Sequence, residues 1–296
     1  MTVTLYTMMI PGLIYLIINN YIPMVGLQIA FKKFNYSLGM WKSPWTGLSN
    51  FTYLFKTKDA LNMTINTLLY NIVFLITGTV FAVFIAILLN ELRNVRAKKI
   101  YQVIFLIPYL ISMVIVSYIV FAFLSFDKGF INNSLLKPLG LPAVNWYMQP
   151  SYWPYILTGV NLWKVFGYSS IIYYATVIGI DTALYEAAVI DRADAWQRIW
   201  HVTLPGLRNT IITLTVLGIG RIFYSDFGLF YQVPQNSGVL ANVTQTIDVY
   251  VYKGLTQLND IGRSSAASFY QSVVGFALVL TANFAVSKLD RDSALF

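Results

Sequence analysis

The sequence contains no cysteine and only one histidine, His201. Without cysteine the chain has no disulfide framework, no cysteine-ligated zinc cluster and no catalytic thiol. A single histidine also argues against His-ligated metal chemistry and against a serine–histidine triad. The dipeptide Gly-Lys is missing too, and an ATPase needs it at the end of its phosphate-binding loop. Any energy that the protein uses must therefore come from outside this chain.

Charge is scarce as well: charged residues make up 11% of the 296 residues, against 57% that are hydrophobic. Soluble globular chains carry about 25% charged residues, so much of this surface must face lipid and the sequence predicts a membrane protein. The net charge of +8 comes from 20 basic residues scattered between hydrophobic stretches. Such scatter favours loops beside anionic lipid and argues against a nucleic-acid partner.

Six stretches are long and apolar enough to cross a bilayer, which takes about 20 residues per helix. They cover residues 5–30, 62–92, 100–125, 153–178, 209–232 and 264–288. The first has no basic segment before it and is longer than the apolar part of a signal peptide, so we expect it to be a span. The predicted fold is an all-α membrane protein with six transmembrane helices, forming a single domain over residues 1–296.

The distribution of basic residues gives only a partial answer on topology. Placing both termini in the cytoplasm puts residues 93–99, 179–208 and 288–296 there, with nine Lys and Arg in 46 residues. The opposite side also holds nine, spread over roughly twice the length. Lys32 and Lys33 follow the first span on the outer side, against the positive-inside tendency. Charge favours cytoplasmic termini but does not decide the topology alone.

The loop at residues 179–208 contains the most informative pattern. It reads Glu186-Ala187-Ala188-Val189-Ile190-Asp191-Arg192, then nine residues, then Val202-Thr203-Leu204-Pro205. The pattern predicts two short amphipathic helices, the first over about residues 183–190. Asp194 and Gln197 have the spacing of a capping pair that starts the second. Such an elbow is either an ordinary connector or a handle for a partner protein.

This spacing closely resembles the "EAA" loop of binding-protein-dependent ABC importers, which is Glu-Ala-Ala, three residues, Gly, nine residues, Ile, one residue, Leu-Pro. The matching residues are Glu186, Ala187, Ala188, Leu204 and Pro205, with Val202 in place of isoleucine. The resemblance implies that the loop fits a groove on an ATP-binding subunit and passes its closure to the spans. It also implies a second homologous permease, two ATP-binding subunits that bind the ATP and Mg²⁺, and an extracytoplasmic solute-binding protein. This chain would then be a transport subunit of the bacterial cytoplasmic (inner) membrane, with no enzymatic activity and no cofactor of its own.

Arg192 is a departure from that pattern, because the family usually has glycine there. If the position requires a positive φ, a residue with a Cβ costs about 1 kcal/mol. Either the elbow bends differently here, or Arg192 accepts the strain. Its guanidinium would also be placed to pair with an acidic group on the partner, and Asp191 beside it belongs to the same predicted coupling surface.

The resemblance extends beyond the loop. Tyr21-Ile22-Pro23-Met24, Trp196-Gln197-Arg198-Ile199-Trp200-His201 and the ending Ala294-Leu295-Phe296 look like carbohydrate-importer permeases. They are most similar to the subgroup that handles oligogalacturonide and alginate oligosaccharides. The resemblance therefore implies an importer of oligosaccharides, including acidic, uronate-containing ones.

Two cations lie deep in predicted spans, Lys164 in the fourth and Arg221 in the fifth. A charge at that depth costs about 2.5–3.5 kcal/mol on insertion scales, so both should face the bundle interior or water. Helical spacing puts Asn161, Lys164 and Tyr168 on one face, and it puts Gly218, Arg221, Ser225 and Gly228 on another. The predicted passage residues are Asn161, Lys164, Tyr168, Arg221, Tyr224, Ser225 and Asp226. Alternatively, the two cations pair with acids of another subunit or cap backbone carbonyls.

The aromatic residues near these cations are open to two interpretations. Trp163, Tyr168, Phe223, Tyr224 and Phe227 cluster there, and sugar rings pack their C–H faces on aromatic planes. Trp and Tyr also form interfacial belts in any membrane protein. The cations themselves suit uronic-acid carboxylates, because charge-assisted hydrogen bonds form between them.

Two other functions remain open from the residues alone. An ion-coupled secondary transporter would be expected to bury carboxylates at mid-membrane, but Asp226 is the only one of twelve acidic residues well inside a span. An intramembrane enzyme would need His pairs, cysteine or paired carboxylates in the spans. Neither pattern is present in the sequence, which favours the importer subunit.

Overall fold

The computed structural model describes residues 2–289, with side chains described from Tyr6 to Lys288. These residues form helices joined by turns and loops, and their one β-type pairing is an isolated antiparallel bridge between Lys32 and Trp45. The predicted all-α class is confirmed. The ending Ala294–Phe296, used above for its resemblance, lies outside the described residues.

The described chain falls into two compact units. The first contains the chain up to Leu61 together with Ile247–Val273, and the second contains Asn62–Thr246 and the chain from Val274 onward. Two long helices, α5 (Lys58–Glu91) and α14 (Ile261–Leu289), each contribute to both units. The prediction of a single domain stays a prediction.

The first unit begins with a helical segment that runs from α1 (Thr2–Leu16) through α2 (Ile22–Met24) and a 3₁₀ segment ending at Phe31. It continues with α3 (Gly39–Lys42), α4 (Thr52–Lys56) and α13 (Ile247–Thr256). Ala30, Phe51 and Ala266 form its buried core, with Phe31 and Phe269 packed against them.

Lys32 in this unit is buried, and its ammonium donates to the carbonyls of Met40 (2.9 Å) and Trp41 (3.2 Å). The same ammonium lies 4.8 Å from the centre of the Trp45 ring. This lysine therefore serves the fold of its own loop, which explains why its position is a poor guide to topology.

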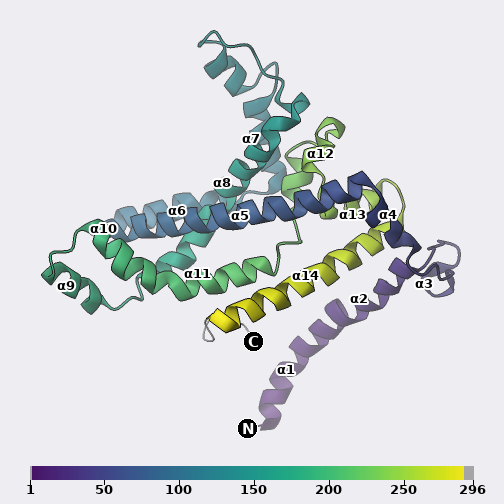
Figure 1. Ribbon diagram of the computed structural model, residues 1–296, viewed down its shortest axis with the longest axis horizontal. Coiled ribbons are helices and arrows are strands. Elements are labelled where there is room, and N and C mark those ends of the chain that lie inside the picture. Colours follow the sequence, from purple (N-terminus) through teal and green to yellow (C-terminus); the bar gives the residue numbers. More distant parts are fainter. Residues whose placement is uncertain (1, 290–296) are drawn as a thin grey trace. The chain divides into compact units, whose positions relative to one another are not determined.

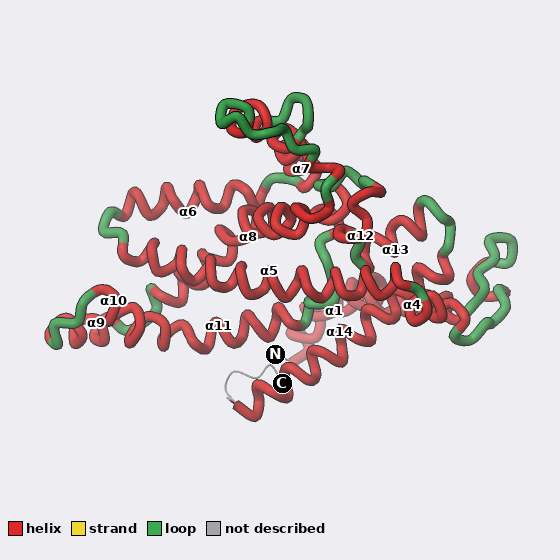
Figure 2. The backbone as a smooth tube through the Cα atoms, turned by 45° about the horizontal axis from the view of Figure 1, so that its top comes forward, coloured by secondary structure: helices red, strands yellow, loops and turns green. Residues whose placement is uncertain are grey.

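The second unit contains most of the remaining helices: α6 (Val95–Leu110), α7 (Met113–Leu124), α8 (Trp153–Val177), α9 (Thr182–Ile190), α10 (Ala195–Arg198), α11 (Leu204–Ile219) and α12 (Ala241–Thr244). Figures 1 and 2 show α5, α6, α8 and α11 running side by side, with α9 and α10 at one end of this group. The turn between α5 and α6 is short because the Asn94 side chain accepts hydrogen bonds from the N–H groups of Arg96 and Ala97, which starts α6 at once.

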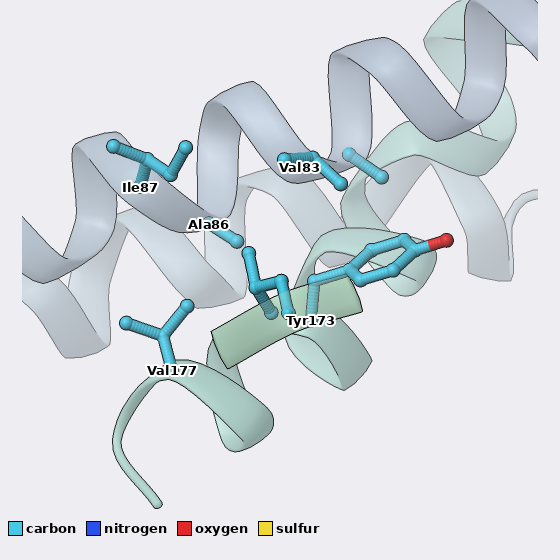
Figure 3. Packing of buried hydrophobic residues seen from close by; sticks show 7 residues of the cluster. Val83, Ala86, Ile87, Tyr173 and Val177 are labelled. Carbon is cyan, nitrogen blue, oxygen red and sulfur yellow. The ribbon is translucent and has the colours of Figure 1, made fainter. Parts of the chain in front are cut away.

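A buried apolar cluster joins these helices near the end that carries α9 and α10. Val83, Ala86 and Ile87 of α5 form one cluster with Tyr173 and Val177 of α8 (Figure 3). Leu207 of α11 completes the cluster and is fully buried. The small alanines of α5 in this cluster let α8 and α11 approach it closely. The predicted coupling loop begins at the end of α8 and ends at the start of α11, so the cluster lies at both ends of that loop.

Within residues 2–289, four helical segments are long and apolar enough to cross a membrane: Tyr6–Phe31, Lys58–Glu91, Ala195–Ile219 and Ile261–Lys288. A fifth candidate is the pair α6 and α7, which are bent by 96° at the residues between them. The helix α8 has the length of a span but contains polar residues such as Asn161 and Lys164. The predicted number of six spans therefore stays a prediction.

The fifth predicted span, residues 209–232, is wrong as one continuous helix. The helix α11 ends at Ile219, and a turn leads to a separate π-helical turn at Gly228–Gln232. The carboxylate of Asp226 accepts a hydrogen bond from the N–H of Leu229 (3.0 Å) and caps this new turn. At its other end, α11 continues without a break from α10 through the π-helical turn Ile199–Thr203, so the helical segment starts fourteen residues earlier than predicted.

Candidate functional site

The predicted coupling loop forms a folded elbow, here called the coupling elbow and defined as residues 181–203. Its first arm is α9, which starts where the Asp181 carboxylate accepts a hydrogen bond from the N–H of Ala183 (2.9 Å). This helix agrees with the predicted one to within a residue. Glu186 and Ala187 on it are exposed, and Ala188 is half-buried.

The bend after α9 shows which conformation Arg192 adopts. The N–H of Ala193 donates to the carbonyl of Ala188 (2.8 Å), and the N–H of Arg192 donates to the carbonyl of Val189 (3.0 Å). These two bonds define a Schellman motif, which closes a helix with one residue in the left-handed conformation, usually glycine. Arg192 occupies that place with φ +56°. Of the two alternatives raised by the sequence, Arg192 accepts the strain.

The second arm starts with a complete capping box. The Asp194 carboxylate accepts from the N–H of Gln197 (2.7 Å), and the Gln197 side chain accepts from the N–H of Asp194 (2.8 Å). The capping pair predicted from the sequence is confirmed. The two arms are also joined to each other, because the hydroxyl oxygens of Tyr185 and Thr203 lie 2.9 Å apart and Thr203 is buried. The two caps and this contact hold the arms in one folded unit.

A depression of about 400 Å³ lies on the elbow. It is lined by residues of both arms: Leu184, Ala187, Ala188, Asp191, Ala193, Gln197, His201 and Val202. Large apolar side chains of the elbow are also exposed, including Ile190 at 81% and Trp196 at 67% of their surface. His201 is held by a 3.0 Å hydrogen bond between its Nδ1 and the carbonyl oxygen of Gln197, which gives it a structural role.

The elbow is anchored in the apolar cluster of the second unit. Ile199 and Leu204 pack against that cluster, and Leu207 is part of it. Pro205 is the second residue of α11, directly after the π-helical turn Ile199–Thr203. Of the predicted coupling residues, Glu186, Ala187, Asp191, Arg192 and Pro205 are exposed, whereas Leu204 faces the interior. The surface of the elbow is therefore tied directly to α5 and α8.

The predicted passage residues of α8 have distinct surroundings. Lys164 is 9% exposed, and its ammonium donates to the carbonyls of Pro108 (3.2 Å), Tyr109 (3.1 Å) and Ile111. Tyr168 is partly exposed, and its ring stacks on that of Tyr109 with centroids 4.5 Å apart. Asn161 is half-buried. For Lys164 the geometry corresponds to the alternative in which it caps backbone carbonyls.

The passage residues predicted in the fifth span do not share a helical face, because the backbone leaves the helix at Gly220. Arg221 is exposed in the turn that follows α11, and Tyr224 is also exposed. Ser225 donates to the hydroxyl of Thr246 (2.7 Å). Gly228 lies against the start of α7, since a Cβ built on it would meet Met113 Cβ at 2.7 Å. The interruption after α11 therefore lies beside the bend between α6 and α7.

Sequence reasoning missed two features at this bend. The first is that α6 ends before Ile111 and that Ser112 caps α7, accepting a hydrogen bond from the N–H of Ile115 (3.4 Å). The available signal was Pro108, which disturbs a helix, together with Ser112 four residues later, which can cap a new one. The second is Gly167, where an added Cβ would lie 1.9 Å from the carbonyl oxygen of Phe105. No sequence pattern distinguishes this glycine from Gly159, the other glycine of α8.

Comparison with known proteins agrees with this geometry. Residues 78–291 match the family described as binding-protein-dependent transport system inner membrane component. The chain is 34% identical to protein LplB of Bacillus subtilis (strain 168) over 97% of this chain and 90% of that protein. It is 32% identical to the polygalacturonan/rhamnogalacturonan transport system permease protein YteP of the same organism, over 97% and 89% of the two chains.

A solved structure with the same architecture is that of a bacterial ABC transporter involved in the import of the acidic polysaccharide alginate. One of its chains superposes with a TM-score of 0.88 and 32% identity, covering 97% of this chain and 96% of that one. A second structure of a bacterial alginate ABC transporter, in complex with an alginate pentasaccharide-bound periplasmic protein, gives a TM-score of 0.87 with 97% and 94% coverage. The chain belongs to the family of binding-protein-dependent transport system inner membrane components, and it is a permease subunit of an ABC importer rather than an enzyme.

Proposed function

We propose that this chain imports oligosaccharides, including acidic, uronate-containing ones, in a complex driven by ATP. The complex would contain a second homologous permease, two ATP-binding subunits that hold ATP and Mg²⁺, and an extracytoplasmic solute-binding protein. The relatives named for polygalacturonan and alginate support an acidic oligosaccharide as the substrate. No cofactor is assigned to this chain.

The observation that carries the proposal is the anchoring of the coupling elbow. An exposed surface of short, apolar and acidic side chains sits on a capped two-helix body. The same body continues into α11 and packs on α5 and α8 through Ile199, Leu204 and Leu207. A displacement of the elbow by closing ATP-binding subunits would therefore turn these helices together.

The topology belongs to the same proposal. Six membrane crossings follow if the bent pair α6–α7 is the third crossing and α8 the fourth, and both termini then lie in the cytoplasm with the coupling elbow. A polar residue in α8 is acceptable in a crossing when it faces protein or water rather than lipid. The substrate passage would run beside the two helix interruptions, along Asn161, Lys164 and Tyr168 and past the turn at Arg221–Asp226. Discontinuous helices of this kind form the substrate sites of many transporters.

Substitution of Ala187 tests the proposal directly. A bulky residue, Ala187→Trp, would fill the depression that Ala187 helps to line, outside the buried cluster. We expect substrate-stimulated uptake in proteoliposomes of the assembled complex to fall by at least about tenfold, while basal ATP hydrolysis persists, because a lost contact worth about 1.4 kcal/mol is a tenfold effect.

The matched control is Ala195→Trp, which places the same side chain on an exposed position in the first turn of α10, outside the lining of the depression. It should reduce uptake less than Ala187→Trp does. Unchanged uptake with Ala187→Trp would contradict the coupling role of the elbow.

A further inference from the structure

The bend between α6 and α7 exposes backbone groups that a bilayer does not solvate. The helix α6 ends at Leu110, so the carbonyls of its last turn have no partner within the helix. The N–H of Ile111 returns to Pro108 (3.3 Å), and the Ser112 side chain serves the first turn of α7. Unsatisfied carbonyls in hydrocarbon cost several kcal/mol each. A donor from elsewhere in the fold is needed.

Lys164 is that donor. Its ammonium has three N–H groups, and the structure places three carbonyls around it, those of Pro108, Tyr109 and Ile111. The C-terminal end of a helix carries partial negative charge, which favours a cation at this place. The side chain is 9% exposed, so the charge is offset by carbonyl oxygens, and by electrostatic attraction to Asp226, rather than by water.

Two neighbours on the same face of α8 hold the same stretch of α6. Gly167 brings the α8 backbone against Phe105, where any Cβ would collide with the carbonyl oxygen. Tyr168 stacks on Tyr109 with an interplanar angle of 11°. Positions 164, 167 and 168 are spaced i, i+3 and i+4, so one face of α8 fits the last turns of α6.

We infer that Lys164 is a positioning residue that holds the α6–α7 bend, and that it does not bind the substrate's carboxylates. This inference rests on the proposed function, because it assigns roles within the same passage. All three of its N–H groups are engaged by backbone carbonyls, whereas the exposed Arg221 lies in the turn that follows α11. The two deep cations therefore have different tasks: one shapes the passage, and the other is free to face the solute.

The first experiment measures the bend itself. The chain has no cysteine, so two introduced cysteines can carry a spin-label pair across the bend. The sites are Val103→Cys in α6 and Tyr118→Cys in α7, which are both exposed. The labels are measured in the assembled transporter in nanodiscs, with accessible cysteines of the partner subunits replaced. Lys164→Met should broaden the interspin distance distribution. The fraction of molecules at distances outside the wild-type peak should rise at least about tenfold, because the hydrogen bonds from the charged ammonium are lost. Lys137→Met removes an exposed loop lysine and should leave the distribution unchanged.

The second experiment separates positioning from substrate binding. Uptake is measured with a uronate oligosaccharide and with its carboxyl-reduced, neutral counterpart. Lys164→Met should lower Vmax for both substrates by the same factor, with the ratio of their KM values unchanged, and Lys164→Gln, which keeps two N–H donors, should restore part of the activity. Arg221→Met is the contrasting variant and should raise KM for the uronate substrate selectively.

Two results would overturn the inference. One is an unchanged distance distribution in Lys164→Met, or in Lys164→Leu, which likewise has no donor, if the methionine variant does not assemble. The other is a rise in KM with Lys164→Met that is confined to the uronate substrate. Failure of the wild-type complex to take up either sugar would contradict the proposed substrate, while the distance measurement would still decide the role of Lys164.

Discussion

The coupling elbow and the α6–α7 bend differ in the range of the interactions that fix them. In the elbow the capping box joins residues three apart, and the Schellman motif joins Ala193 to Ala188. At the bend, Lys164 reaches carbonyls 53 to 56 residues away in the sequence. Both ends of the elbow's bend are fixed by local hydrogen bonds, whereas the α6–α7 bend adds to its local Ser112 cap a set of contacts from the distant helix α8.

This difference has a functional side. A locally specified elbow keeps its shape while it moves, which suits a part that passes a displacement from one protein to another. A bend held by a distant side chain depends on the packing of α8 on α6, so it is sensitive to any change in the arrangement of these helices. The following predictions test this distinction, from the larger effect to the smaller.

Gly167→Ala should have the larger effect, because the bend depends on close packing. The added Cβ would lie 1.9 Å from the Phe105 carbonyl oxygen, and a backbone atom yields little. Overpacking of this kind costs about 1–3 kcal/mol, so we expect a lower unfolding midpoint in detergent and a loss of uptake. Gly159→Ala is the matched control, because a Cβ at this glycine of α8 meets no atom within 4 Å. Equal midpoints for the two variants would show that the packing of α6 on α8 is looser than described.

Arg192→Gly should have the smaller effect and the opposite sign. Glycine has no penalty at φ +56°, so the Schellman motif should gain about 1 kcal/mol. We expect slower proteolysis within the elbow and unchanged uptake, whereas Arg192→Ala, which keeps a Cβ, should show no such protection. Lost uptake with Arg192→Gly despite an intact elbow would mean that the guanidinium itself contacts the partner.

The same distinction explains how much the sequence alone predicts. The helical class, α9, the capping pair at Asp194 and Gln197, and the family follow from local spacing and from the EAA pattern. The interruption after α11 was missed because the apolar residues on both sides of Arg221 look like a continuing helix. Asp226 acts as a cap only because α11 has already ended before it, and the sequence does not show that end. The role of Lys164 was left open between a passage residue and a carbonyl cap, because the carbonyls it contacts belong to another helix. Periodicity describes one segment at a time and carries no information on such partners.

The most direct test asks what the coupling elbow touches in the assembled complex. Ala187→Cys provides a single thiol in a chain without cysteine, and a benzophenone maleimide attached there reacts with its neighbour on illumination. We predict a cross-link to the ATP-binding subunit that blocks uptake, and none to that subunit from Leu139→Cys, which is exposed in the loop of residues 126–152. A probe at Ala187 that reaches no ATP-binding subunit, or that is labelled only from the extracytoplasmic side, would contradict the account.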